Sequence, residues 1–257
     1  MNAVGGFGVC RSGVAQIRLV KNGGVVSGGS AFLIDGGLVT NSHVIRAFPD
    51  AVASIRFEGM GPNAAIRIPV NASVATESPE AEKDFAFLRL DEPEFAGRHR
   101  FVFAVAPTVA VGKQVGFLGY PFSMEHLTCH VAYVSASFDS NGVKTYQLDG
   151  SVNAGNSGGP LIDLDTREVV GVVTRAHLGL IESAFHELID ALRQNQKVLT
   201  QTGPSMQIMG VDPLEALRVS QAIMERIAMD LHRSANVGIG FAFSSEYVRD
   251  ATTSLAR

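Results

Sequence analysis

Three residues that are far apart in the sequence carry side chains that together can hydrolyse an acyl bond. Ser157 lies in GNSGGP, residues 155–160, where glycines permit a tight, exposed loop that holds the hydroxyl toward a substrate. Serine is a weak nucleophile near neutral pH, so the reaction needs a base that takes its proton and an acid that orients this base. His43 in LVTNSHVI and Asp84 in EKDFAFLRL supply such groups, and histidine, aspartate, serine is a known triad order.

Each of these stretches also has a purely structural interpretation. Ser-Gly and Gly-Pro pairs occur in many loops, and a histidine at a strand end is usually a surface or half-buried side chain. An aspartate before a strand is usually a turn or cap residue. Asp91 is a competing carboxylate, but it follows its strand and begins a polar linker. The occurrence of three such contexts in one order favours catalysis over three unrelated turns.

Short apolar runs separated by turn residues extend from Val14 to about Gly179. Their spacing of roughly 8 to 12 residues is typical of the strands of a barrel or sandwich. No helical crossover fits between consecutive runs, so the pattern predicts a mainly β fold, with enough strands for two small barrels in tandem. We expect the break between the barrels in the polar stretch DEPEFAGRHR, residues 91–100.

The pattern changes after Leu180, where apolar residues recur near the 3.6-residue period of a helix. One helix is predicted in IESAFHELIDALRQNQKVL, and Asp212-Pro213-Leu214-Glu215 is typical of the start of a second. We expect residues 180–234 to form an antiparallel helical hairpin, followed by a strand in VGIGFAF and a short C-terminal helix from Ser245. The apolar stripe of the second helix is predicted at Leu217, Ile223, Met224, Ile227 and Leu231.

Composition narrows the classes of function. A hydrophobic content of 46% over 257 residues is enough for a large core. The formal charge of −4 leaves no basic excess, so we expect neither nucleic acid nor a membrane as a partner. No apolar run reaches the length of a membrane span and no signal peptide is recognised, so we expect a cytoplasmic protein. Cys10 and Cys129 lack metal-site spacing, and we expect no metal and no cofactor.

The chain resembles chymotrypsin-like (trypsin-like) serine proteases, most closely the protease domain of the HtrA family. The matching stretches are GGSAFLIDGGLVTNSHVI, DFAFLRL, GYPF, GNSGGPLID, VVGVVT and VGIGFAF, which span about residues 12–179 and 235–250. The resemblance implies a double six-stranded β-barrel with the active site in the cleft between the barrels, to which the sequence pattern adds a helical-hairpin insertion and a short C-terminal helix. It also implies that His43 is the general base, Asp84 the orienting acid and Ser157 the nucleophile.

By this resemblance, the 257 residues form a single trypsin-like protease domain. Residues 1–95 are the expected N-terminal barrel, residues 96–179 and 235–257 the C-terminal barrel with its helix, and residues 180–234 a helical insertion. Family members usually carry a signal sequence and a PDZ module, and we expect neither in this chain. The insertion replaces a short loop of the family between two strands of the primary pocket.

The resemblance also assigns an oxyanion hole and a substrate-binding cleft. The backbone N–H groups of Gly155 and Ser157 are the implied oxyanion donors, and Ser151, six residues before the nucleophile, is the implied base of the primary pocket. Because Ser151 carries no carboxylate, we expect small or aliphatic residues, and not Lys or Arg, on the acyl side of the cut bond. The other predicted substrate-binding residues are Thr174, Arg175, Ala176 and Gly240.

The sequence thus predicts a serine endopeptidase that cleaves protein or peptide substrates through an acyl-enzyme. The alternative is a latent or inactive protease-fold scaffold, controlled by a regulatory protein that binds the helical insertion. For the insertion itself, a structural role is also open, in which both apolar stripes pack on each other and on the barrel. GNSGG also matches the nucleophile elbow of an esterase, but that elbow needs a helix directly after it, and its acid and histidine downstream.

Overall fold

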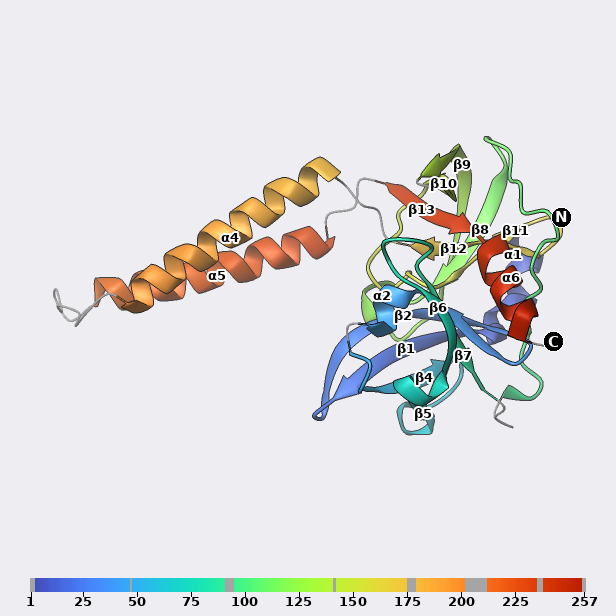
Figure 1. Cartoon of the computed structure of the whole chain (residues 1–257), viewed down its shortest axis with the longest axis horizontal. Coiled ribbons are helices and arrows are strands. Elements are labelled where there is room, and N and C mark those ends of the chain that lie inside the picture. Colours follow the sequence, from blue (N-terminus) through green and yellow to red (C-terminus); the bar gives the residue numbers. More distant parts are fainter. Residues whose placement is uncertain are drawn as a thin grey trace. The chain divides into compact units, whose positions relative to one another are not determined.

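The computed structural model describes residues 3–46, 48–90, 95–140, 142–174, 179–201, 212–234 and 238–255. The chain divides into two compact units, one formed by residues 1–176 together with 236–257 and the other by residues 177–235. All described strands belong to the larger unit, and the smaller unit contains two helices (Figure 1). No helix among the described residues is long and apolar enough to cross a membrane.

The first half of the larger unit is an antiparallel sheet of seven strands in the order β5-β4-β1-β2-β3-β7-β6. The strands are β1 Val14–Lys21, β2 Gly24–Ile34, β3 Gly37–Thr40, β4 Val52–Phe57, β5 Ile66–Pro69, β6 Val74–Ser78 and β7 Phe85–Arg89. The edge strands β5 and β6 are joined by the four-residue helix α3, Val70–Ser73. The sheet must therefore curl, because its two opposite edges lie within the short reach of this connection.

Local sequence explains how this sheet forms. Ala15, Ile17 and Leu19 are buried at alternate positions of β1, as the two-residue period of a strand requires. Asn22 and Gly23, with φ of 52° and 79°, make the turn into β2, and Asn-Gly is a favoured pair for such a hairpin. The buried side chains of the sheet form one hydrophobic cluster.

The second half of the larger unit is a closed barrel with the strand order β10-β13-β12-β11-β8-β9. Its strands are β8 Gln114–Gly119, β9 Thr128–Ser140, β10 Val143–Asp149, β11 Pro160–Asp163, β12 Val169–Thr174 and β13 Ile239–Ser244. Closure removes the unpaired edges that an open sheet exposes. A second cluster, which includes Phe32, Phe85 and Phe243, contains residues from both halves and fixes them against each other.

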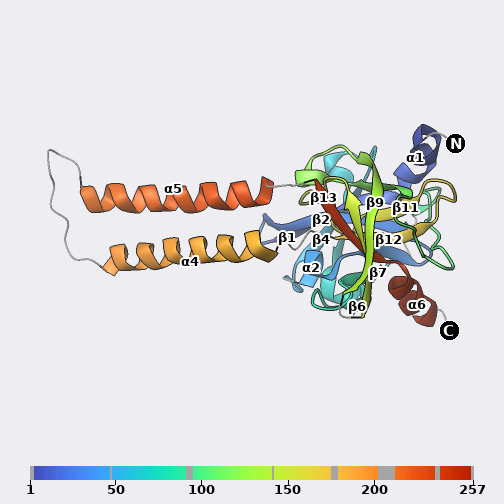
Figure 2. The same ribbon diagram turned by 90° about the horizontal axis from the view of Figure 1, so that it is seen from above.

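Short helices complete the larger unit (Figures 1 and 2). They are α1 Ala3–Cys10, α2 Ser42–Arg46 and α6 Glu246–Leu255, with 3-10 turns η1 Arg11–Gly13, η2 Pro62–Ala64 and η4 Pro121–Ser123. The mainly β class, the closed six-stranded barrel and the C-terminal helix are confirmed. In the N-terminal half the strand pairing gives a curled sheet of seven strands where six in a closed barrel were expected, because α3 and not a strand pair joins its edges.

The smaller unit is the predicted helical hairpin, formed by α4 Gly179–Gln201 and α5 Pro213–Ser234, which lie side by side in both views (Figures 1 and 2). Asp212 caps α5, since its Oδ1 accepts hydrogen bonds of 2.9 Å and 3.3 Å from the N–H groups of Leu214 and Glu215. The ion pair between Arg193 and Glu225, at 2.9 Å, joins the two helices.

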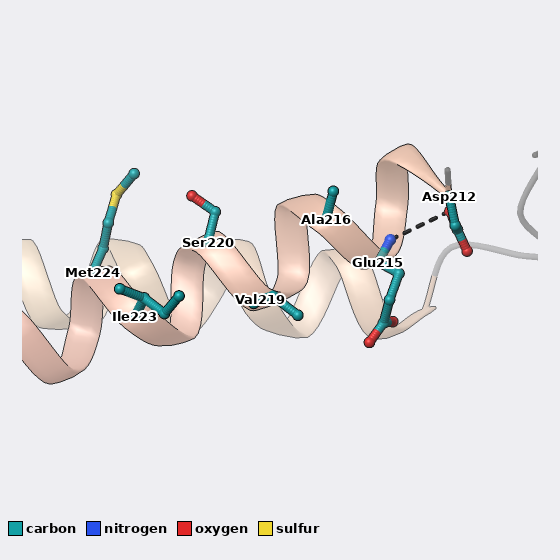
Figure 3. A pocket seen from close by; sticks show the side chains of 7 residues that line it. All are labelled: Asp212, Glu215, Ala216, Val219, Ser220, Ile223 and Met224. Atoms are coloured by element: carbon teal, nitrogen blue, oxygen red, sulfur yellow. Dashed lines mark hydrogen bonds between the residues drawn. The ribbon is translucent and has the colours of Figure 1, made fainter. Parts of the chain in front are cut away.

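The apolar stripe of α5 is exposed. Leu217, Ile223, Met224 and Ile227 are each about half exposed, so these side chains do not pack closely on α4. Part of this surface is hollowed, and Figure 3 shows Ala216, Val219, Ser220, Ile223 and Met224 along successive turns that start from the capped end of the helix. The structural interpretation of the insertion, in which the two stripes pack on each other, is therefore wrong for this stripe. The side chain of Leu231 lies outside the described residues.

Removing the helical unit is expected to leave the larger unit folded. Strands β12 and β13 pair directly, with Thr174 opposite Phe241, so a short Gly-Ser linker can replace residues 177–235 without separating them. The shortened chain should keep a β-rich circular dichroism spectrum and a single cooperative thermal transition, measured beside the intact chain. Loss of cooperative unfolding would contradict the independence of the two units.

Candidate active site

The imidazole of His43 is held by the carboxylate of Asp84. His43 lies on α2, directly after β3, and Asp84 immediately precedes β7, the strand that pairs with β3. Asp84 Oδ2 is 2.8 Å from His43 Nδ1, and Asp84 Oδ1 accepts a 3.0 Å hydrogen bond from the His43 backbone N–H. Both side chains are only 8% exposed. Because a carboxylate only accepts hydrogen bonds, Nδ1 carries the proton and a neutral ring presents Nε2 as a base.

Asp84 is itself fixed from three sides. Its backbone carbonyl accepts a 2.7 Å hydrogen bond from Asn41 Nδ2, and its N–H donates to the Pro79 carbonyl. Its φ of 41° lies in the left-handed region, which aspartate tolerates better than most residues. Thr174, at the end of β12, donates from Oγ1 to Asp84 Oδ2 at 3.0 Å. Thr174 is one of the predicted substrate-binding residues, and its hydroxyl contacts the carboxylate that orients His43.

Ser157 lies in the loop between β10 and β11, and this loop is packed against the segment that carries His43. Gly158 has φ of 86°, and a Cβ at this position would collide with the Ser30 carbonyl and the Thr40 hydroxyl and lie 3.0 Å from the Asn41 nitrogen. Only glycine permits this approach. The strand β3 and the start of α2 therefore lie directly beside the Ser157 loop.

Both halves of the larger unit hold the Ser157 loop. The Ser157 carbonyl accepts a 2.8 Å hydrogen bond from the Ser30 N–H of β2, and the Gly158 N–H donates to the Val173 carbonyl of β12 at 2.8 Å. Within the described residues no hydrogen bond joins Ser157 Oγ to the His43 ring. Such bonds between nucleophile and base are often long without substrate and shorten when it binds.

The loop also presents two free backbone donors. The Ala154 carbonyl accepts a 2.6 Å hydrogen bond from the Phe122 N–H, and the Asn156 carbonyl accepts one of 3.0 Å from Gly159. In a trans peptide the N–H points opposite to the carbonyl, so the N–H groups of Gly155 and Ser157 point away from these partners. Neither donates to an acceptor in the described part of the chain. Two neighbouring N–H groups that point away from their loop form a concave donor pair of the kind that binds anions, so this pair is a candidate anion site.

Val152, which was not predicted from the sequence, lies beside a residue of the predicted primary pocket. Ser151 is exposed, and Gly240 lies on β13 opposite Leu148 of β10. The nearest neighbours of Gly240 are the side chain of Val152 and the carbonyl of Gly150, with which any added Cβ would collide. Val152 therefore occupies space beside Gly240. The predicted residues Arg175 and Ala176 lie outside the described residues.

Two functional candidates were not predicted from the sequence. Val152 could have been found from its place next to Ser151. Ser30 is a fully buried polar residue within the apolar strand β2, and its hydroxyl and backbone contact the Ser157 loop. A serine inside an apolar run was the only local signal for it.

Several other titratable side chains of the larger unit have pKa values shifted by burial. Burial raises the pKa of Tyr120 to about 12, so its hydroxyl stays protonated at neutral pH. Burial also raises the pKa values of the Cys10 and Cys129 thiols, which makes them poor nucleophiles. The His130 ring stacks on Phe117 at 4.5 Å, and burial lowers its pKa. No cluster of three or more metal-ligating side chains occurs in the described ranges.

Comparisons with known proteins identify a family and several relatives for this chain. Residues 29–172 match the model of the trypsin-like peptidase domain. The chain is 32% identical over 155 residues to Protease Do-like 1, chloroplastic, of Arabidopsis thaliana, with 57% of this chain and 32% of that protein covered. It is 34% identical over 158 residues to a probable periplasmic serine endoprotease, DegP-like, of Brucella suis, with 58% and 28% covered.

Solved structures show the same fold. The HtrA-type protease AlgW with a tripeptide superposes with a TM-score of 0.62 at 17% identity, covering 99% of this chain and 64% of that one. At this identity the match shows the fold alone. The chain spans about a third or less of the length of the curated relatives named above.

Proposed function

Because the chain belongs to the trypsin-like peptidase domain family, we propose that it is a serine endopeptidase with His43, Asp84 and Ser157 as its catalytic residues. The similarity to Do-like and DegP-like proteases supports the reaction class. The observation that carries the assignment of residues is the double contact of Asp84 with His43, at 2.8 Å to Nδ1 and 3.0 Å to the backbone N–H. This contact orients a base beside the loop that carries Ser157.

The proposed reaction proceeds in two halves. Ser157 Oγ attacks the carbonyl carbon of the scissile peptide bond while His43 Nε2 takes its proton, and the Gly155 and Ser157 N–H groups bind the oxyanion. The tetrahedral intermediate collapses, the C–N bond breaks, and protonated His43 gives its proton to the leaving amine. Water then attacks the acyl-enzyme with His43 again as the base, which releases the acid product and restores Ser157. Asp84 keeps the ring oriented and stabilises its charged form throughout.

We propose a protein or peptide substrate with a small or aliphatic residue on the acyl side of the cut bond. AlgW is a relative in fold that was solved with a tripeptide, which supports a peptide ligand. The side chain of Val152 beside Gly240 reduces the space of the pocket, and the exposed Ser151 brings no carboxylate to pair with Lys or Arg. A narrow, uncharged pocket favours small apolar side chains.

The Val152→Ala variant should accept larger side chains. Removing two methyl groups beside Gly240 enlarges the pocket, and differences of this size typically change kcat/KM by about 10-fold or more between substrates. A panel of peptides that differ only at the acyl-side residue should show an increase for Leu and Phe relative to Ala and Val. Val105→Ala, at a valine that is 85% exposed, is the matched control. An unchanged ranking in Val152→Ala would remove this residue from the pocket.

The proposed activity is tested by labelling with a fluorophosphonate probe and by cleavage of casein. We expect the probe to modify one residue, which mass spectrometry of the digested protein should identify as Ser157, and the modification should abolish casein cleavage. Modification at another serine would refute the assignment of Ser157. A folded protein that neither labels nor cleaves would refute a constitutive protease.

The second candidate function is a latent protease-fold protein controlled by a regulatory protein at the helical unit. The exposed apolar stripe of α5 favours it, because such a surface on a helix is suited to a partner. Under this hypothesis the intact chain is inactive in isolation. The cytoplasmic location, the absence of nucleic-acid and membrane partners, and the single-domain boundaries stay predictions from the sequence.

A further inference from the structure

Ser30 is a buried serine on β2 that contacts the loop on both sides of the predicted oxyanion donors. We propose that Ser30 is a positioning residue that sets the oxyanion hole, an inference that rests on the proposed protease function. Ser30 does not touch the reacting atoms in this proposal. Its role is to hold the peptide unit between the two donors, so that both N–H groups point to one place.

Ser30 makes four hydrogen bonds, which pair both of its donors, its hydroxyl oxygen and its carbonyl oxygen. Its Oγ donates to the Gly155 carbonyl at 2.7 Å and accepts from the Tyr120 N–H at 2.9 Å. Its own N–H donates to the Ser157 carbonyl at 2.8 Å, and its carbonyl accepts from Thr40 Oγ1 at 2.8 Å. The residue is 0% exposed, so water cannot replace any of these partners. All of these bonds except the one from Thr40 reach the second half of the larger unit.

The bond to Gly155 acts on the peptide unit that connects the two donors. This unit has its carbonyl on Gly155 and its N–H on Asn156, and the N–H donates to the Asn153 carbonyl at 3.0 Å. It is thus held at both ends, once by its own loop and once by Ser30. Gly155 has φ of 97° and carries no Cβ to restrict it. A glycine loop needs an external bond to select one of its accessible conformations, and Ser30 Oγ supplies it.

The hydrogen bond from the Tyr120 N–H to Ser30 Oγ links Ser30 to the first donor, the N–H group of Gly155. Tyr120 immediately precedes η4, and Phe122 within this turn donates the 2.6 Å hydrogen bond to the Ala154 carbonyl. That bond directs the Gly155 N–H away from the turn. Phe122 and Ser123 have φ of 52° and 57°, a backbone conformation that a neighbouring structure must maintain. Ser30 therefore acts on Gly155 O directly and on Ala154 O through the turn.

Kinetics of Ser30→Ala test the proposal. The variant loses the donor to Gly155 and the acceptor for Tyr120, while the Ser157 hydroxyl and the His43–Asp84 pair remain. We expect kcat to fall by about 10- to 100-fold with KM unchanged, since deleting one oxyanion donor costs about 10²- to 10³-fold and here the donors are misplaced and not deleted. The affinity for a peptidyl boronic acid, which places an oxygen in the oxyanion hole, should fall by a similar factor.

Ser245→Ala is the matched control. Ser245 is also 0% exposed, and its Oγ donates to the Val169 carbonyl at 2.8 Å. Its loss should lower the melting temperature without changing kcat or boronic acid affinity. If Ser30→Ala, like Ser245→Ala, leaves kcat and the affinity for the boronic acid unchanged, Ser30 is only structural and the proposal is overturned. If Ser30→Ala is too unstable to purify, Ser30→Cys keeps the approximate volume with a weak donor, and the same selective loss of kcat is expected.

A measurement without turnover separates this inference from the proposed function. If the wild type neither labels nor cleaves, the protease proposal fails, but the position of the loop is still measurable by amide hydrogen exchange. We expect the Asn156 amide, whose N–H donates to the Asn153 carbonyl, to exchange faster in Ser30→Ala and at the wild-type rate in Ser245→Ala. Equal exchange in both variants would overturn the role of Ser30 in either case.

Discussion

Ser157→Ala is expected to lower kcat for peptide hydrolysis by about 10⁶-fold, the usual effect of removing the nucleophile of a serine protease. The mutation deletes one oxygen atom and leaves the free N–H groups of Gly155 and Ser157 unchanged. Substrate should therefore still bind, and KM should change little. Hydrolysis that persists should proceed by direct attack of water at a rate set by binding and the oxyanion donors. Turnover of a chromogenic peptide at high protein concentration measures this residual rate.

Ser254→Ala is the control for this experiment, because Ser254 lies on α6 and is exposed. It should cleave as fast as the wild type. Both variants should keep the wild-type melting temperature within a few degrees, since Ser157 Oγ makes no hydrogen bond within the described residues. Retention of most of the activity in Ser157→Ala would show that another residue is the nucleophile.

Asp84→Asn is expected to lower kcat by about 10⁴-fold at neutral pH with little change in shape. Asp84 accepts hydrogen bonds from His43 Nδ1, the His43 backbone N–H and Thr174 Oγ1. An amide offers one oxygen acceptor and one donating NH₂ group in place of two acceptors. When the NH₂ group faces Nδ1, the ring must place its proton on Nε2. That tautomer cannot take the proton of Ser157.

The variant separates orientation from folding. Asparagine tolerates the left-handed φ of 41° at this position about as well as aspartate, so the backbone should be preserved. Nitrogen NMR of the His43 ring should report the exchanged tautomer directly, beside the loss of kcat. Asp50→Asn, at an exposed carboxylate that pairs with Lys21, is the control and should be fully active. Full activity in Asp84→Asn, together with loss of activity in Asp91→Asn, would show that Asp91 and not Asp84 orients the His43 ring.

Local sequence was sufficient for the elements and for the residue types of the site. Periodicity predicted the two helices of the smaller unit, and the cap at Asp212 was correctly predicted because capping depends only on neighbouring residues. Short apolar runs separated by turn residues predicted the strands, because strand and turn preferences also depend on neighbouring residues. His43, Asp84 and Ser157 were selected from short motifs, and the structure brings His43 and Asp84 into contact because β3 and β7 pair.

Tertiary structure alone decided which atoms meet. Ser30 and Gly155 are 125 residues apart, and Thr174 is 90 residues from Asp84, so no local pattern links either pair. The space beside Gly240 depends on how Val152 packs across two strands. The outward position of the α5 stripe was also unpredictable, because an amphipathic pattern shows that a helix has an apolar face but not what that face contacts. Sequence by itself determined the groups available for chemistry, and strand pairing and packing across the two halves determined their partners.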